Sequence, residues 1–167
     1  FVDNQSIACA DVGTGSGAIA IVLAKEESKV HMMATDISEE AVVTARKNAE
    51  NNEADIEFVT GDMLQPLIDK GIKLDVLVSN PPYIPQEEVM EKSVVDFEPH
   101  VALFGGEDGL KFYREIFKNC KKVLKEKAFM AFEMGWDQGE ALSNLAREYF
   151  ESATITVHKD MSGKDRM

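Results

Sequence analysis

The amino-acid sequence predicts an α/β protein with a doubly wound, mostly parallel β-sheet. Segments with strand-like and helix-like patterns alternate along nearly all of the 167 residues, which is typical of strands joined by crossover helices. Glycine-rich, acidic and amide residues follow directly after several of the predicted strands. Because parallel strands end at one edge of their sheet, and ligands bind at that edge, the same pattern predicts where the functional site lies.

The first half of the chain alternates four predicted strands with predicted helices. The strands are short apolar runs bounded by glycine, asparagine or acidic residues. Ser38 is placed to cap the second helix, with Glu39 and Glu40 in its first turn, where acidic side chains stabilise a helix. The predicted strands cover residues 7–12, 30–35, 56–60 and 74–79, and the predicted helices cover residues 16–26 and 39–51.

The second half begins with a long irregular stretch over residues 80–107, which holds four of the five prolines. A loop of that length inside a compact domain is usually functional or disordered. The spacing of apolar residues then predicts a helix that begins at Asp108 and keeps core positions as far as Leu124. The next predicted element is a strand over residues 128–133. It is followed by a helix that Asp137 and Glu140 cap and that reaches Phe150, and then by a sixth strand over residues 153–158.

Composition limits the classes of protein to consider. A chain of 167 residues with 44% hydrophobic residues fits one soluble domain over residues 1–167. No apolar run approaches the roughly 20 residues of a membrane span. We interpret Cys9 and Cys120 as buried free thiols of a protein in a reducing cytoplasm. The net charge of −12 argues against a nucleic-acid partner, since phosphate binding requires a basic surface.

A glycine-rich turn follows the first predicted strand. Its sequence is Gly13-Thr14-Gly15-Ser16-Gly17, and such turns let the backbone approach a ligand closely because no Cβ intervenes. The segment suits a nucleoside cofactor. Gly13, Gly15 and Ala18 also satisfy the dinucleotide pattern G-x-G-x-x-A, so NAD stays open at this point, as does a tight turn without a ligand.

Acidic residues follow the second and third predicted strands. Asp36 can accept hydrogen bonds from both ribose hydroxyls of a nucleoside cofactor, and Ile37 beside it is assigned to the same site. Asp62 can reach an adenine amino group, and Met63 can pack on the adenine face. A solvated turn for Asp62 and a core position for Met63 are equally compatible with the sequence. The alternative for Asp36 is a helix cap, although Ser38 already offers one.

The stretch Asn80-Pro81-Pro82-Tyr83, after the fourth predicted strand, distinguishes between the cofactors. Two prolines fix φ and remove two backbone donors, so carbonyl groups of the turn can point outward as acceptors. Asn80 adds a side-chain carbonyl, and two acceptors can hold both hydrogens of an –NH₂ group, while the Tyr83 ring can stack on a substrate amide. Hydride transfer has no use for such a clamp, so the pattern favours methyl transfer from S-adenosylmethionine to nitrogen.

These motifs resemble those of the bacterial glutamine N5-methyltransferases that modify peptide-chain release factors. The resemblance covers nearly the whole chain. Residues 11–17 are similar to the cofactor loop of that family and residues 80–83 to its substrate motif. Residues 98–110 are similar to its E-P-x-x-A-L-x-G-G-x-D-G-L segment, which generic nitrogen methyltransferases lack. Further matches are Glu133-Met134-Gly135, Gln138-Gly139, Lys159-Asp160, Gly163, Asp165 and Arg166.

The resemblance implies a Rossmann-like class I S-adenosylmethionine-dependent methyltransferase fold with seven strands. It implies S-adenosylmethionine as cofactor, bound by residues 13–17, Asp36, Met63 and Asn80, with S-adenosylhomocysteine as product. It also implies that residues 80–83 hold a glutamine from a Gly-Gly-Gln loop of a release factor. The expected partner is therefore a protein in the cytoplasm, without direct contact to nucleic acid or membrane, and no metal site is expected.

Some features differ from the family's pattern. Met63 stands where some relatives have an aromatic residue, and Phe97 replaces a frequent tyrosine. The helical docking domain before the first strand is expected to be absent from this chain, and the chain is expected to stop where the last strand begins. Since that strand neighbours the sixth, residues 153–158 are expected to be displaced, poorly ordered or paired with another molecule.

The leading hypothesis is a protein-glutamine methyltransferase domain. A second hypothesis is an amino methyltransferase that acts on adenine N6 or guanine N2 in nucleic acid, which requires base extrusion and phosphate contacts. The sequence also leaves open a non-catalytic cofactor-binding module and an NAD-dependent reductase.

Overall fold

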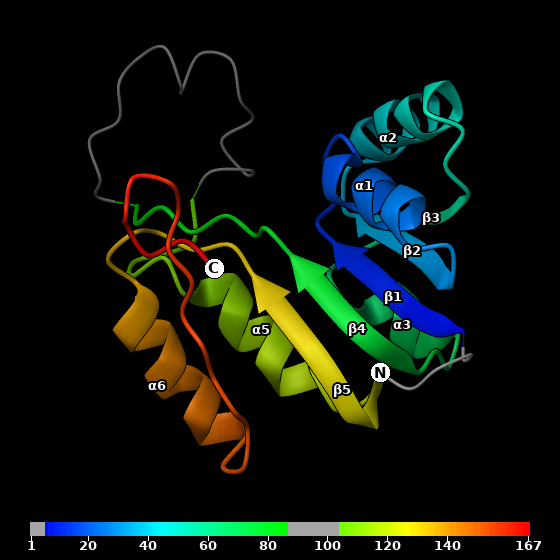
Figure 1. Cartoon of the computed structure of the whole chain (residues 1–167). Coiled ribbons are helices and arrows are strands. Elements are labelled where there is room, and N and C mark those ends of the chain that lie inside the picture. Colours follow the sequence, from blue (N-terminus) through cyan, green and yellow to red (C-terminus); the bar gives the residue numbers. More distant parts are fainter. Residues whose placement is uncertain (1–5, 87–103) are drawn as a thin grey trace. The chain divides into compact units, whose positions relative to one another are not determined.

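The computed structural model of the chain describes residues 6–86 and 104–167. The chain divides into two compact units, one formed by Phe1–Asn80 with Asn119–Ala131 and the other by Pro81–Lys118 with Phe132–Met167. The prediction of a single domain over residues 1–167 stays a prediction. Figure 1 shows the elements: β1 (Ile7–Val12), α1 (Ala18–Glu26), β2 (Val30–Asp36), α2 (Glu39–Asn51), β3 (Ile56–Thr60), α3 (Gln65–Asp69), β4 (Leu74–Ser79), α5 (Lys111–Cys120), β5 (Leu124–Phe132) and α6 (Gly139–Tyr149).

The first unit is built on a five-stranded sheet in the order β3-β2-β1-β4-β5. The β1–β2, β1–β4 and β2–β3 pairs are parallel. The chain moves outward from β1 to β3 and then returns to place β4 on the other side of β1. The strand order therefore reverses beside β1, which is the position where doubly wound sheets bind ligands. The predicted fold class is confirmed.

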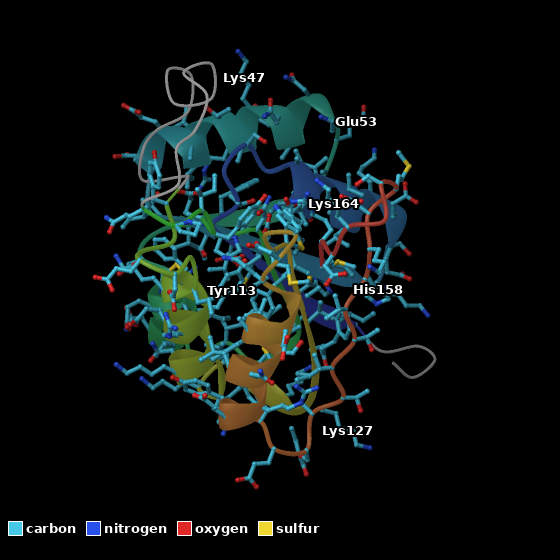
Figure 2. All side chains as sticks on the ribbon, turned by 90° about the vertical axis from the view of Figure 1, so that its left-hand side faces the viewer. Lys47, Glu53, Tyr113, Lys127, His158 and Lys164 are labelled. Carbon is cyan, nitrogen blue, oxygen red and sulfur yellow. The ribbon has the colours of Figure 1, made fainter. Side chains whose placement is uncertain are left out.

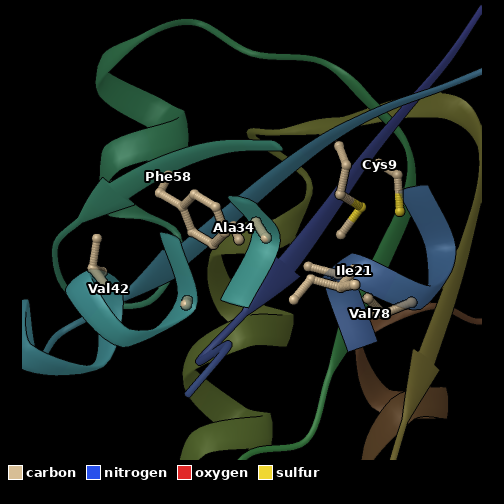
Figure 3. Close-up of a cluster of buried hydrophobic side chains, with 10 residues drawn as sticks. Cys9, Ile21, Ala34, Val42, Phe58 and Val78 are labelled. Atoms are coloured by element: carbon tan, nitrogen blue, oxygen red, sulfur yellow. The ribbon is translucent and has the colours of Figure 1, made fainter. Parts of the chain in front are cut away.

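Helices cover both faces of this sheet. Figure 1 shows α1 and α2 on one face and α3 on the other. Buried apolar side chains from the strands meet the inner sides of α1 and α2, as Figure 3 shows for Cys9, Ile21, Ala34, Val42 and Phe58. This packing fixes the strand ends, because each crossover helix is held against the sheet along its apolar side.

The local predictions for the first unit hold closely. The strands β1 to β4 begin and end within one residue of their predicted bounds. Ser38 caps α2, since its side chain accepts a hydrogen bond from the Ala41 amide at 3.2 Å. Helix α1 begins at Ala18 and not at Ser16, because Gly17 has a φ of +82° and ends the glycine turn. The short helix α3 was not predicted.

Aromatic side chains form the core of the second unit. Phe117 of α5 contacts Phe132, Tyr149 and Phe150 at ring-centroid distances of 5.5, 5.9 and 5.9 Å. Tyr113, labelled in Figure 2, is fully buried, and its hydroxyl donates to the Glu133 carbonyl at 2.6 Å. Helix α6 is thus held to α5 by a tilted contact with Tyr149 and an edge-to-face contact with Phe150, and such ring pairs stabilise beyond simple area burial.

Several predictions for the second half were wrong in their bounds. Helix α5 begins at Lys111 and not at Asp108, because Gly109 adopts a φ of +74°. The helix ends at Cys120, and β5 begins at Leu124, four residues before the predicted strand. The capping pair is also wrong: the residue before α6 is Gln138, and its side chain makes no cap hydrogen bond.

Residues 153–158 form no strand, so the prediction of a sixth strand is wrong. Nearly all of these residues are exposed, and an extended segment without a buried face gains little from sheet packing. The His158 amide and carbonyl instead bond Met167 and Arg166 in a hairpin around Gly163. The sheet of the described residues therefore has five strands, and not the six predicted for this chain.

No helix within residues 6–86 and 104–167 combines the length and the apolar composition that crossing a membrane requires.

Candidate functional site

The glycine turn after β1 depends on backbone conformations that favour glycine. Gly13, Gly15 and Gly17 have φ values of +73°, +54° and +82°. A Cβ at Gly17 would lie 3.0 Å from the Ala45 side chain, so this glycine also lets α1 approach α2. At Gly13 and Gly15, apart from the adjoining residues, no atom of the described chain lies within 4 Å of the Cβ position, so the backbone there borders open space. A ligand can approach the chain at these two residues without meeting a side chain.

Hydrogen bonds hold this turn against β2. The amides of Gly13 and Thr14 both donate to the Thr35 carbonyl, at 2.8 and 3.0 Å. The Gly15 amide donates to Asp36 Oδ2 at 2.8 Å. Asn48 of α2 fixes the other side of the turn by donating to the Ser16 carbonyl at 2.9 Å. The turn is therefore rigid before any ligand binds.

Asp36 lies at the end of β2 and has two roles in this structure. Its Oδ2 accepts from Gly15, and its Oδ1 accepts from the Ser38 amide at 2.9 Å. A carboxylate offers about four acceptor directions, so two remain for the hydroxyls of a ribose. Ile37, beside it, is 69% exposed and presents an apolar surface.

Asp62 and Met63 follow β3 in a strained turn. Asp62 is exposed, and its carbonyl accepts from the Gln65 amide that begins α3. Met63 is half-buried with a φ of +46°, which is unusual for a residue with a side chain. Its carbonyl accepts from the Thr35 hydroxyl at 3.2 Å, so this turn is attached to the end of β2.

The strand register brings these candidate residues to one edge of the sheet. Val12 pairs with Thr35, Asp36 pairs with Thr60, and Asp11 pairs with Val78. The chain leaves the sheet after each of these positions. The glycine turn, Asp36, the turn at residues 62–63 and Asn80 therefore share the carboxyl edge, as the sequence predicts.

Asp11 carries a buried carboxyl group. It lies in the segment 11–17 that matches the family, but the sequence did not indicate a role for it. It is 1% exposed, and its Oδ2 accepts from the Thr14 hydroxyl at 2.6 Å. Oδ1 is buried without a hydrogen bond of ordinary geometry to the described residues. Burial raises the pKa of Asp11 to about 6, against the opposing effect of the Thr14 hydroxyl and with a smaller increase from the charge of Asp36. The sequence signal that could have identified Asp11 is the presence of an acidic residue inside the apolar stretch 7–12.

Asn80 ends the first unit and is exposed just beyond β4. Ser79, directly before it, is buried, and its hydroxyl donates to the Val12 carbonyl at 2.5 Å. This bond fixes the end of β4 to the end of β1. Within the described residues, the Asn80 side chain forms no hydrogen bond, so its carboxamide can bind a ligand.

The second unit begins with Pro81, Pro82 and Tyr83, which we call the acceptor bend. The prediction that its carbonyl groups point outward is wrong for two of the three residues. The Tyr83 carbonyl accepts from Gln138 Nε2 at 2.9 Å. The Pro82 carbonyl oxygen packs against Gly105, where a Cβ would lie 2.6 Å from it. Neither the Pro81 nor the Pro82 carbonyl accepts a hydrogen bond from a described residue. Because the Pro82 oxygen packs against Gly105, the Pro81 carbonyl is the acceptor that the bend offers to a ligand.

The Tyr83 side chain is held at its hydroxyl. The hydroxyl donates to Glu133 Oε1 at 3.2 Å and accepts from Arg166 at 3.3 Å. Burial and the negative charge of Glu133 raise the pKa of Tyr83, so the phenol stays neutral. Arg166 also lies 3.5 Å from Asp160 Oδ2, and its backbone carbonyl accepts from the Met134 amide at 2.9 Å.

The sequence alone did not assign roles to Gln138, Glu133 and Arg166, although all three lie in segments that match the family. Their contacts with Tyr83 join positions 50 to 83 residues apart in the chain, and no local spacing reveals such contacts. No cluster of three or more metal-ligating side chains is found in the part of the chain that the structure describes.

The sheet order, the glycine turn after β1 and the carboxylate at the end of β2 together define the Rossmann-like class I methyltransferase fold. A methyltransferase from Pyrococcus furiosus has this fold, with a TM-score of 0.69, 22% identity, and coverage of 98% of this chain and 73% of its own. The T. Thermophilus 16S rRNA N2 G1207 methyltransferase in complex with AdoMet and guanosine has a TM-score of 0.63 and 17% identity, covering 97% of this chain and 36% of its own.

The family model of the methyltransferase small domain matches residues 1–98, and the chain belongs to that family. The release factor glutamine methyltransferase of Bacillus subtilis (strain 168) is 46% identical over 168 residues, which is 99% of this chain. The resemblance that the motifs indicate is thereby confirmed. The chain spans 58% of the length of that relative.

Proposed function

We propose that this chain carries out methyl transfer from S-adenosylmethionine to the side-chain amide nitrogen of a glutamine in peptide-chain release factors. The observation that carries the proposal is the acceptor bend together with Asn80. The Asn80 carboxamide and the Pro81 carbonyl form no hydrogen bond with the described residues. The other two carbonyl groups of the bend are already engaged by Gln138 and packed against Gly105.

The carboxyl edge of the sheet suits a nucleoside cofactor. Asp36 keeps acceptor capacity for ribose hydroxyls, and the Gly13 and Gly15 backbone borders open space. Asp62, Met63 and Ile37 offer a carboxylate and apolar surface on the same edge for an adenine ring. We assign residues 13–17, 36–37, 62–63 and Asn80 to the binding of S-adenosylmethionine, which supplies an electrophilic sulfonium methyl group when bound.

A primary amide matches the remaining acceptors. Its nitrogen carries two hydrogens, and Asn80 Oδ1 and the Pro81 carbonyl can accept one each. The lone pair of an amide nitrogen is delocalised into its carbonyl group, so the nitrogen is a poor nucleophile. Holding both N–H bonds orients the nitrogen, and orientation alone can supply roughly 7–11 kcal/mol of barrier reduction in favourable cases. The Tyr83 ring, fixed at its hydroxyl, gives the planar amide a surface to stack on.

The relatives supply the substrate class. A protein named release factor glutamine methyltransferase is 46% identical across nearly the whole chain, and its name specifies a glutamine of a release factor. The net charge of −12 supports a protein substrate over a nucleic acid, because it disfavours binding to phosphates. Translation termination places such an enzyme in the cytoplasm, with S-adenosylhomocysteine as its second product.

A radiolabel transfer assay tests the proposal. Labelled S-adenosylmethionine is incubated with the chain and with purified release factor, ribosomal RNA or DNA. Label in the release factor alone is the expected result. Label in RNA or DNA would instead favour an amino methyltransferase acting on nucleic-acid bases.

An Asn80→Ala variant tests the clamp within the same assay. Loss of one acceptor misaligns the amide nitrogen, so turnover is expected to fall at least ~100-fold. Cofactor affinity, measured by calorimetry, is expected to change much less, because other residues of the carboxyl edge remain. Wild-type turnover in this variant would refute the clamp.

A further inference from the structure

Gln138 is a buried side chain whose carboxamide joins three backbone segments of the second unit. It is 7% exposed. Its Oε1 accepts from the Gly135 amide at 2.9 Å. Its Nε2 donates to the Tyr83 carbonyl at 2.9 Å and reaches the Asp108 carbonyl at 3.5 Å. The acceptor bend is therefore tied to the loop before α5 and to the turn before α6 by one side chain.

Two glycines show how closely these segments approach. A Cβ at Gly109 would overlap both the Tyr83 carbonyl oxygen and Gln138 Nε2. A Cβ at Gly105 would lie 2.6 Å from the Pro82 carbonyl oxygen and from the Gly109 carbonyl oxygen. The backbone of the bend therefore packs so closely against Gly105 and Gly109 that neither position has room for a side chain. Gln138 is the side chain that adds a hydrogen bond to this backbone packing.

We propose that Gln138 is a positioning residue for the acceptor bend and acts through Tyr83. The proposal rests on the proposed function and deepens it. By donating to the Tyr83 carbonyl, Gln138 occupies that oxygen, so that Asn80 and Pro81 supply the two acceptors for the two hydrogens of one amide. It also holds the backbone of Tyr83, while Glu133 and Arg166 hold the hydroxyl of the same residue.

A structural role and a positioning role have different consequences. A residue that only stabilises the fold affects stability, and every activity of the folded protein survives its loss. A residue that fixes the bend affects the alignment of the amide nitrogen, and a misplacement of about 1 Å can cost ~100-fold in rate. The effect should therefore appear in kcat for glutamine methylation and leave the dissociation constant of the cofactor unchanged.

Gln138→Glu separates the two roles through pH. The introduced carboxylate keeps the shape of the side chain, loses the donor to Tyr83, and faces two carbonyl oxygens. Burial and those oxygens raise the pKa of the introduced carboxyl group. Once protonated, the group regains one O–H donor. Gln138→Met removes the hydrogen bonds at every pH, and Asn144→Asp adds the same charge at an exposed position of α6 as a control.

The measurements are kcat with release factor and S-adenosylmethionine from pH 6 to 8, cofactor affinity, and circular dichroism. We expect kcat of Gln138→Glu at pH 8 to be ~10–100-fold below wild type. Relative to wild type, it should recover by at least ~5-fold on lowering the pH to 6 as the carboxyl group protonates. Gln138→Met should show the same loss at every pH, with a folded spectrum, and Asn144→Asp should match wild type.

Each other outcome overturns the inference. If Gln138→Glu and Gln138→Met keep wild-type kcat, the bend does not depend on Gln138. If neither variant folds, or if the loss lies in cofactor affinity, the role of Gln138 is structural. If the wild-type chain methylates glutamine but the variants give one of these contrary results, the inference about Gln138 fails and the proposed function stands. A wild-type chain that transfers no methyl group to glutamine refutes both.

Discussion

The buried carboxyl group of Asp11 makes a measurable prediction for stability. Its pKa is raised to about 6 in the folded chain, from an ordinary value of 3.8, chiefly because burial disfavours the ionised form. In the unfolded chain the carboxyl group ionises first as the pH rises. The folded state therefore loses stability from about pH 4 up to about pH 6, and the loss is complete above the folded-state pKa. The perturbation that isolates this effect is Asp11→Asn.

The difference between the two pKa values corresponds to about 3 kcal/mol at high pH. Part of this loss of stability has already occurred at pH 4. The free energy of unfolding is therefore expected to fall by about 2.5 kcal/mol between pH 4 and pH 8. Asparagine keeps the acceptor for the Thr14 hydroxyl. Its buried –NH₂ group replaces the unpaired Oδ1 and costs about 1–3 kcal/mol, but that cost does not depend on pH. The pH dependence is therefore the diagnostic quantity, and not the absolute stability.

Urea denaturation followed by circular dichroism measures the free energy of unfolding at each pH. Other carboxyl groups titrate in both proteins, so their contributions cancel in the difference between wild type and Asp11→Asn. We expect wild type to lose about 2.5 kcal/mol relative to the variant between pH 4 and pH 8. A difference that stays constant within about 0.5 kcal/mol over this range would show that Asp11 titrates normally, and would refute the reasoning.

Three further predictions concern single residues. Gly109→Ala should lower the free energy of unfolding by more than ~2 kcal/mol and abolish methylation, since the added Cβ overlaps the Tyr83 carbonyl. The control is Gly71→Ala, at a residue with a φ of +65° whose added Cβ meets open space. It should lower the free energy of unfolding by only about 1–2 kcal/mol in urea denaturation. Asp36→Ala should weaken cofactor binding at least ~10-fold by calorimetry, because a charged acceptor and the Gly15 tether are lost; unchanged affinity would contradict the assignment. Phe117→Ala should lower the free energy of unfolding by about 3–5 kcal/mol in urea denaturation. Phe129→Ala, at a side chain that is 53% exposed, should lower it by less than ~1 kcal/mol. Equal losses would show that Phe117 does not lie in the core of the second unit.

The parts of the fold with local signals were predicted correctly. The bounds of β1 to β4 follow from apolar runs, the Ser38 cap from a capping residue, and the carboxyl edge from the rule that parallel strands end together. The errors fall where distant contacts override a local pattern. Asp137 and Glu140 have the spacing of a capping box, yet the backbone before α6 is fixed by the hydrogen bond between Gly135 and Gln138.

The candidate site shows the same division. The position of Asp36 and the glycine turn at the carboxyl edge was predictable from their places after predicted strands, and their role in binding stays a prediction. The direction of the carbonyl groups in the acceptor bend was not predictable, because it depends on Gln138, 55 residues from Tyr83, and on Gly105. Residues 87–103, with Phe97 and part of the segment 98–110 that matches the family, lie outside the described residues.

The measurement that tests the central claim most directly is mass spectrometry of a release factor after incubation with this chain and S-adenosylmethionine. Peptide fragmentation locates any added methyl group. We predict one methyl group on the side-chain amide nitrogen of the glutamine in the Gly-Gly-Gln loop, and at least ~100-fold slower modification when Asn80→Ala replaces the wild-type chain. A methyl group on any other residue, or an unmodified glutamine after wild-type treatment, would contradict the account.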